Sequence, residues 1–291
     1  MDQFEKALPF SGFVRERQPQ IAQTRTGRGA AWRQVDHGPR IHLPEVENYA
    51  CAVIDNRADS LDNSPMPGRF DGILLDFYGT VAAGDRQAVE DTCASVIRAC
   101  GLDFDPARFA ILWGQRYFEL VGESNHESFR ALIECETISL RETLAGMQQV
   151  VNVSPFIEQL EAYWRDPPIH DDVTDFLERV NLPVCVVSNA DTHALMQAIG
   201  KHGLRFEGVL TSEMVRAYKP DPKIFEHALA LIGVDAHRAM HVGDSLHSDV
   251  AGASSAGITA TWLCREDRIY DVGSHGADHT VNSLRQVLEL L

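Results

Sequence analysis

Four short segments of this chain each carry polar side chains of the kind that phosphate chemistry requires. They are GILLDFYGT with Asp76, VCVVSNA with Ser188 and Asn189, RAYKPDP with Lys219, and MHVGDSLHSD with Asp244 and Asp249. Three of them begin as short apolar runs that are typical of buried strands. Ligands of open parallel α/β sheets bind at the carboxyl ends of the strands. We therefore expect these side chains to meet at one site at that edge of a sheet.

The second half of the chain alternates between strand and helix patterns. Strands are expected at 184–187, 209–210, 239–242 and 258–263, and helices at 173–180, 192–202, 221–232, 248–256 and 284–290. Such alternation is typical of a parallel sheet with helices on both faces. The predicted fold class is α/β, with a doubly wound parallel sheet.

The segment between the first and second of these strand motifs has a helical pattern throughout. Val89, Cys93, Val96 and Ile97 recur at helical spacing, and Gly101 supplies a stop. We predict an all-helical domain of about four helices over 85–165, inserted into an α/β core formed by 69–84 and 166–291.

Residues 1–68 differ in composition and in hydrophobic pattern from the rest of the chain. They are rich in arginine, glutamine and glycine and show no sustained periodicity, and Asn-Ser-Pro-Met-Pro-Gly at 63–68 has the composition of a linker. The prediction is an N-terminal extension that is disordered or loosely packed.

The composition limits the partners. A net charge of −16 over 291 residues argues against nucleic acid and against an anionic membrane, because both require a basic surface. A small phosphorylated metabolite is compatible with it, since a local cation can reverse the field inside a cleft. The scattered cysteines and the lack of a long apolar stretch or signal pattern lead us to expect a cytoplasmic protein. We expect it to be a monomer or a homodimer.

Together and in this order, the four motifs resemble those of the haloacid dehalogenase-like (HAD) hydrolases, over about residues 70–291. The first motif corresponds to Asp76–Thr80, the second to Ser188, the third to Lys219, and the fourth to Gly243–Asp244 with Asp249. The helical insertion resembles the cap domain of the first subclass of that superfamily.

The resemblance implies a role for each residue. Asp76 would be the nucleophile and form a covalent aspartyl intermediate. Lys219 would supply positive charge to the reacting group, Ser188 and Asn189 would bind phosphoryl oxygens, and Thr80 would brace the loop beside them.

A metal ion is expected at the same place. Converging carboxylates repel one another unless a cation lies between them, and Mg²⁺ prefers oxygen ligands. The predicted ligands are Asp76, Asp244 and Asp249, with the backbone carbonyl of Tyr78 added by the family resemblance.

Tyr78 departs from the phosphatase pattern. Phosphatases of the superfamily carry a second aspartate at this position as general acid and base, and a phenol with a pKa near 10 is a poor base at neutral pH. The dehalogenases resemble this chain here, because they have a tyrosine in the same place and halide leaves without a proton. The fourth motif favours a phosphatase instead, since dehalogenation needs no cation.

The sequence therefore predicts an HAD-like hydrolase, with a Mg²⁺-dependent phosphatase acting on a small phosphorylated metabolite as the main interpretation. The alternatives are a metal-independent 2-haloacid dehalogenase and a non-catalytic binding protein with the same fold. The candidates for substrate contacts in the helical insertion are Trp113, Arg116, Tyr117, His126 and Arg130.

Overall fold

The computed structural model describes residues 69–265 and 276–291, so the predicted N-terminal extension lies outside the described residues. The core is a six-stranded parallel sheet in the order β3-β2-β1-β4-β5-β6. Its strands are β1 (Gly72–Leu75), β2 (Val184–Ser188), β3 (Gly208–Thr211), β4 (Ala239–Gly243), β5 (Thr259–Leu263) and β6 (His279–Val281). The predicted fold class is confirmed.

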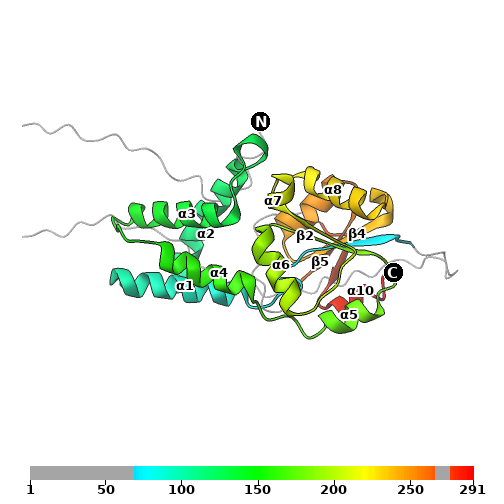
Figure 1. Cartoon of the computed structure of the whole chain (residues 1–291), viewed down its shortest axis with the longest axis horizontal. Helices are drawn as coiled ribbons and strands as arrows, with labels where there is room; N and C mark the ends of the chain where they lie inside the picture. Colours follow the sequence, from blue (N-terminus) through cyan, green and yellow to red (C-terminus); the bar gives the residue numbers. More distant parts are fainter. Residues whose placement is uncertain (1–68, 266–275) are drawn as a thin grey trace, which may run out of the picture. The chain divides into compact units, whose positions relative to one another are not determined.

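The central strand β1 is buried on both faces of the sheet, as its unbroken apolar sequence requires. Ile73 and Leu75 belong to one hydrophobic core and Leu74 to the other, because successive side chains of a strand point to opposite faces. Helices cover both faces (Figure 1). The first core contains residues of α5 (Val173–Arg179), α6 (Thr192–Lys201) and α10 (Leu284–Val287), and the second contains residues of α8 (Pro222–Ile232) and α9 (Gly252–Ser255).

The helical insertion, residues 85–165, has a hydrophobic core of its own. It consists of α1 (Asp85–Cys100), α2 (Pro106–Glu123), the short 3₁₀ turn η2 (His126–Ser128), α3 (Leu132–Gly146) and α4 (Ser154–Arg165). Helix α1 ends at Gly101 in the left-handed conformation, as predicted from the glycine. Figure 1 shows the four α-helices gathered into one bundle.

Three elements in the carboxyl-terminal part of the chain differ from the sequence prediction, one of them because the helix expected at 284–290 extends only over α10, Leu284–Val287. Strand β6 was not predicted, because it has three residues of which only Val281 is buried apolar. The helix expected at 248–256 is instead a π-helical turn, η4 (Leu246–Ala251), followed by the short α9. The short elements α7 (Ser212–Val215) and η3 (Ala236–Arg238) complete the described structure.

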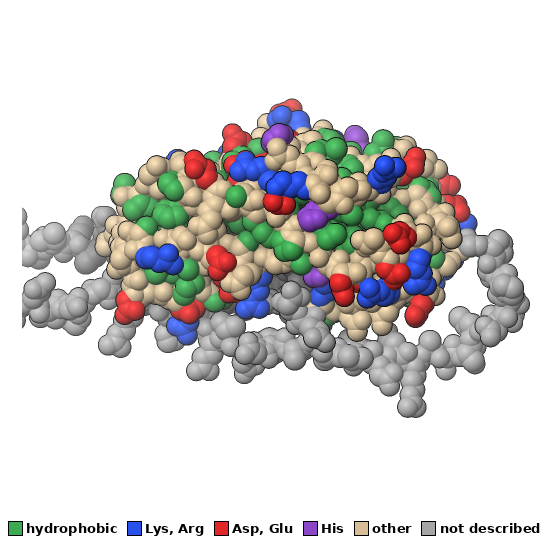
Figure 2. Space-filling model, turned by 60° about the horizontal axis from the view of Figure 1, so that its bottom comes forward, with side chains coloured by type: hydrophobic (Ala, Val, Ile, Leu, Met, Phe, Trp, Pro, Cys, Tyr) green, Lys and Arg blue, Asp and Glu red, His purple; other side chains and the backbone are tan. Residues whose placement is uncertain are grey.

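The surface view in Figure 2 shows acidic and basic side chains interspersed on one face, without a single-sign stripe. No helix within the described residues combines the length and apolar character needed to cross a membrane.

An ion pair between Asp172, just before α5, and Arg265, just after β5, also reaches the loop after β1. Asp172 accepts hydrogen bonds from Arg265 Nη1 and Nη2, at 3.1 and 3.0 Å, and from the backbone N–H of Leu284 at 2.7 Å. Arg265 also donates to the carbonyl of Thr80 at 2.9 Å. The Asp172 carboxylate therefore binds both Arg265, after β5, and Leu284, at the start of α10.

We expect Asp172→Ala to lower the free energy of unfolding by about 3–5 kcal/mol, because it leaves the Arg265 charge buried without its partner. Urea unfolding measures this. The matched change Asp175→Ala removes an exposed carboxylate that also pairs with arginine, and should cost about 1 kcal/mol or less. Equal losses in the two variants would contradict this explanation.

Candidate active site

The sheet order brings three of the four motifs together. Strands β2, β1 and β4 are neighbours, and at their carboxyl ends lie Ser188, Asp76 and Asp244 respectively. Lys219 comes from the loop between α7 and α8, and Asp249 lies in η4. The predicted convergence at one edge of the sheet is what the structure shows.

The Lys219 ammonium group lies between two of the carboxylates. Its Nζ donates to Asp76 Oδ1 and to Asp249 Oδ1, each at 2.6 Å, and to the carbonyl of Val187 at 2.8 Å. An ammonium group has three donors, so every one of them is used. All three charged side chains are buried.

Burial and pairing act on these groups in opposite directions. Burial raises the pKa of Asp76, and the nearby Lys219 charge opposes that rise. Burial alone would raise the pKa of Asp249, but Lys219 and His241 bring it well below its usual range. Burial alone would lower the pKa of Lys219, yet Asp249 and Asp76 raise it. The lysine therefore stays charged between its two carboxylates at neutral pH.

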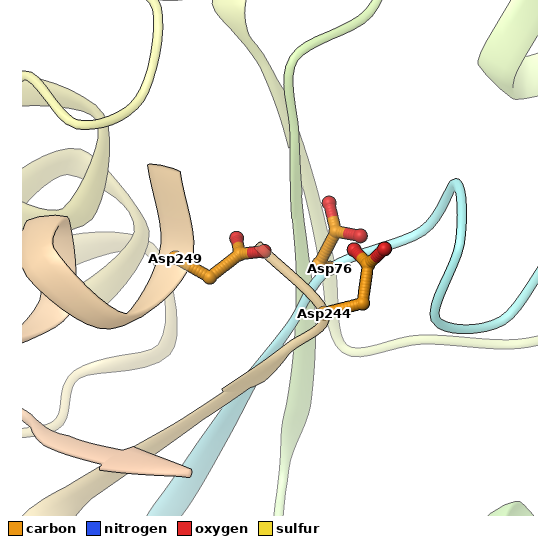
Figure 3. Close-up of side chains that lie close together, drawn as sticks. All are labelled: Asp76, Asp244 and Asp249. Atoms are coloured by element: carbon orange, nitrogen blue, oxygen red, sulfur yellow. The ribbon is translucent and has the colours of Figure 1, made fainter. Parts of the chain in front are cut away.

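Asp76, Asp244 and Asp249 form a compact group of carboxylates (Figure 3). One oxygen of each lies within 4.8 Å of the others. Asp249 is already bound by protein groups on both oxygens: Oδ1 by Lys219 and by His241 Nε2 at 3.0 Å, and Oδ2 by the Ser245 N–H at 3.0 Å. Asp76 Oδ2 is buried and accepts no hydrogen bond from the described residues.

The backbone leaves room for Asp244 beside the loop after β1, at Gly79. Gly79 has a φ of 88°, and a Cβ at this position would lie 2.3 Å from Asp244 Oδ2. Only glycine combines this conformation with so close an approach. The Asp-x-x-Gly spacing of the first motif therefore has a structural reason.

Tyr78 is held by a backbone group of the helical insertion. Its hydroxyl donates to the carbonyl of Trp164 at 2.6 Å, and the two rings meet edge to face with centroids 4.9 Å apart. Burial, and then the charges of Asp191, Glu136 and Asp76, raise the pKa of Tyr78. The raised pKa means that the phenol holds its proton at neutral pH. That proton is also used in the hydrogen bond to the Trp164 carbonyl.

The other predicted residues differ in what they contact. Ser188 is buried at the end of β2. Asn189 holds the peptide of Lys219: its Oδ1 accepts the Lys219 N–H at 2.7 Å, and its Nδ2 donates to the Lys219 carbonyl at 3.1 Å. Thr80 Oγ1 is buried and makes no hydrogen bond with a described residue, whereas its carbonyl accepts from Arg265. The loop is therefore braced through the backbone of Thr80.

Several candidates from the helical insertion have structural partners. Trp113 is buried in the core of the insertion and donates to Ser139 Oγ, and Arg116 pairs with Glu119 and Glu142 at the surface. His126 pairs with Asp221 of the core.

Sequence reasoning missed Glu136 as a site residue. Its carboxyl is buried and accepts a hydrogen bond from Trp164 Nε1 at 2.8 Å. Trp164 in turn accepts the hydrogen bond of Tyr78 through its carbonyl, so Trp164 links Glu136 to Tyr78. Burial raises its pKa to about 8, although the Trp164 bond acts the other way. A carboxyl on the otherwise apolar face of a predicted helix was the signal available in the sequence.

Comparisons with known proteins agree with the motifs. Residues 70–257 match the haloacid dehalogenase-like hydrolase family. The chain is 25% identical over 224 residues to the (S)-2-haloacid dehalogenase of Pseudomonas sp. strain YL, which covers 75% of this chain and 93% of that protein. It is 33% identical over 138 residues to the phosphoserine phosphatase of Thermus thermophilus, but this match covers 45% of the chain and 55% of the phosphatase.

Solved structures show the same fold. The L-2-haloacid dehalogenase of Xanthobacter autotrophicus superposes with a TM-score of 0.63 at 17% identity, covering 76% of this chain and 98% of that one. The similarity therefore extends over the α/β core and the helical insertion together.

The raised pKa of Glu136 makes stability depend on pH. Between pH 4.5 and about 8 the folded protein keeps a proton that the unfolded chain has lost, so the free energy of unfolding falls as pH rises through this window. We expect Glu136→Gln, which cannot ionise, to remove up to about 1.4 kcal/mol of that fall per pH unit. Thermal unfolding from pH 5 to 8 measures it. Glu158→Gln, at an exposed position of α4, is the control, and identical slopes in the two variants would refute the expectation.

Proposed function

The chain belongs to the haloacid dehalogenase-like hydrolases, and we propose that it hydrolyses the carbon–halogen bond of a 2-haloacid. The sequence alone favoured a phosphatase, and that prediction is not confirmed. Two dehalogenases of bacterial origin match the chain over 93% and 88% of their own length, whereas the phosphoserine phosphatase matches over 55%.

The observation that carries the proposal is the hydrogen bond from Tyr78 to the Trp164 carbonyl. Tyr78 stands two positions after the nucleophile, where a phosphatase would need a group that gives up and takes back a proton. Its hydroxyl is committed to a backbone acceptor and its pKa is raised. Halide departs as a stable anion, so carbon–halogen cleavage does not require that proton.

Asp76 is oriented for the first step. Lys219 holds Oδ1 at 2.6 Å, while Oδ2 accepts no hydrogen bond from a described residue. In the proposed reaction Oδ2 attacks C2 of the haloacid, the carbon–halogen bond breaks, and the halide takes the bonding pair. Water then hydrolyses the aspartyl ester, which releases the 2-hydroxy acid and a proton and restores the Asp76 carboxylate.

Ser188 and Lys219 serve this reaction by binding and by charge. Ser188 is buried at the end of the strand next to Asp76, and we propose that its hydroxyl binds the substrate carboxylate. The Lys219 charge opposes the rise in the Asp76 pKa that burial causes. It also holds the carboxylate in place, because its other two donors are fixed by Asp249 and Val187.

A second candidate, a Mg²⁺-dependent phosphatase, is favoured by one observation: the cluster of three buried carboxylates. Their oxygen donors fit Mg²⁺, and Asp76 and Asp244 would hold the ion with Asp249 and the Tyr78 carbonyl as the further predicted ligands. When bound, the ion would offset the charge of the carboxylates and of a phosphoryl group.

Halide and phosphate release distinguish the two candidates. We expect chloride from (S)-2-chloropropionate at an equal rate in EDTA and in Mg²⁺, measured with a halide electrode. Asp76→Asn should lower the rate at least about 10³-fold, since it removes the nucleophile, whereas Asp175→Asn at an exposed position should not. Phosphate release from phosphorylated metabolites that depends on Mg²⁺, with no halide release, would overturn the proposal in favour of the second candidate.

A further inference from the structure

Helix α3 of the helical insertion is capped by a residue of the α/β core. Its own N-cap position is Ala131, whose methyl group accepts no hydrogen bond, although the first N–H groups of a helix need acceptors. Leu132 N–H donates to Asp191 Oδ1 at 2.6 Å and Ile133 N–H donates to Asp191 Oδ2 at 2.9 Å. Both oxygens of one core carboxylate thus serve the start of α3.

Asp191 is itself the N-cap residue of the core helix α6, with the extended backbone expected there. Its carboxylate nevertheless makes no hydrogen bond to that helix. The N–H of Thr192, at the start of α6, donates instead to Glu213 Oε2 at 2.7 Å. Asp191 has therefore been turned away from the donors of its own helix and toward those of α3.

This contact lies between the loop after β2 and the helical insertion. On the core side, Asp191 is three residues beyond Ser188. On the other side, Glu136 lies in the next turn of α3 and accepts from Trp164, whose carbonyl holds Tyr78. Through Glu136, α3 is therefore hydrogen-bonded to the residue whose carbonyl accepts the Tyr78 proton.

We propose that Asp191 is a positioning residue for hydrolysis: it holds the helical insertion closed over Asp76 by capping α3, and its carboxylate passes to the N–H groups of its own helix α6 when the insertion opens. The kinetic part of this proposal rests on the proposed function. The contact itself does not, because it is made between two helices of the free protein.

The contact is suited to repeated opening. Burial raises the pKa of Asp191, and the N–H groups of Ile133 and Leu132 oppose that rise, so the charged carboxylate depends on these two donors in the closed arrangement. A carboxylate at an N-cap position has an alternative set of donors within its own helix. When the insertion opens, the Asp191 carboxylate can therefore accept hydrogen bonds from N–H groups of α6. Only the N–H groups of Leu132 and Ile133 then need water as their acceptor.

Hydrogen exchange of the full-length protein tests the contact directly. The amides of Leu132 and Ile133 have no intrahelical acceptor, so their protection should depend on Asp191. We expect Asp191→Ala to speed their exchange at least about tenfold, and Asp191→Asn, which keeps one acceptor oxygen, to have a smaller effect. Glu213→Ala is the matched control, because it removes a carboxylate that caps α6 within the core: it should speed exchange at Thr192 and leave Leu132 and Ile133 unchanged.

Steady-state kinetics of halide release test the positioning role. If the closed arrangement is less populated, the apparent affinity falls by the same factor. We expect Asp191→Ala to raise KM about tenfold while kcat stays within about twofold, with Asp191→Asn intermediate and Glu213→Ala unchanged.

Three results would overturn the proposal: unchanged exchange at Leu132 and Ile133, exchange that rises equally throughout the chain, or a fall in kcat at constant KM. If Asp191→Ala does not fold, the Asn variant decides by the same criteria. The exchange measurement needs no substrate, so a protein without halide release but with the expected amide exchange would refute the proposed function and leave the capping contact established.

Discussion

The sharing of the Lys219 ammonium group between Asp76 and Asp249 is the interaction on which the candidate active site depends. Three buried carboxylates at one sheet edge would repel one another, and one lysine with all donors engaged pairs two of them. The same contacts fix one oxygen of Asp76, the proposed nucleophile, and leave the other without a hydrogen bond from the described residues. Charge balance and the orientation of Asp76 thus have a common origin.

The position of that lysine is secured by parts of the chain far apart in sequence. Asn189, at the end of β2, binds the peptide of Lys219 on both sides. Tyr218, the residue before the lysine, donates its N–H to Asn125 Oδ1 at 2.7 Å and its hydroxyl to the Arg130 carbonyl at 2.8 Å. The helical insertion therefore contacts the loop that carries Lys219, as well as the loop after β2.

The parts predictable from the sequence were those with local signals. Apolar runs ending in Asp76, Ser188 and Asp244 predicted neighbouring strand ends, and Gly101 predicted the end of α1. Strand β6 was not predicted because His279–Val281 has almost no apolar pattern. It is a strand because it pairs with β5. Asp191 and Glu136 escaped for a different reason: their partners, in α3 and at Trp164, are brought near only by tertiary packing.

The acceptor of the Tyr78 hydroxyl is a main-chain carbonyl. Replacing the side chain at position 164 would leave that carbonyl in place, so mutation there does not by itself free the phenol. A lineage of this fold could acquire acid–base chemistry most directly by changing residue 78 itself. A change at residue 78 alone would then separate a dehalogenase of this fold from a phosphatase.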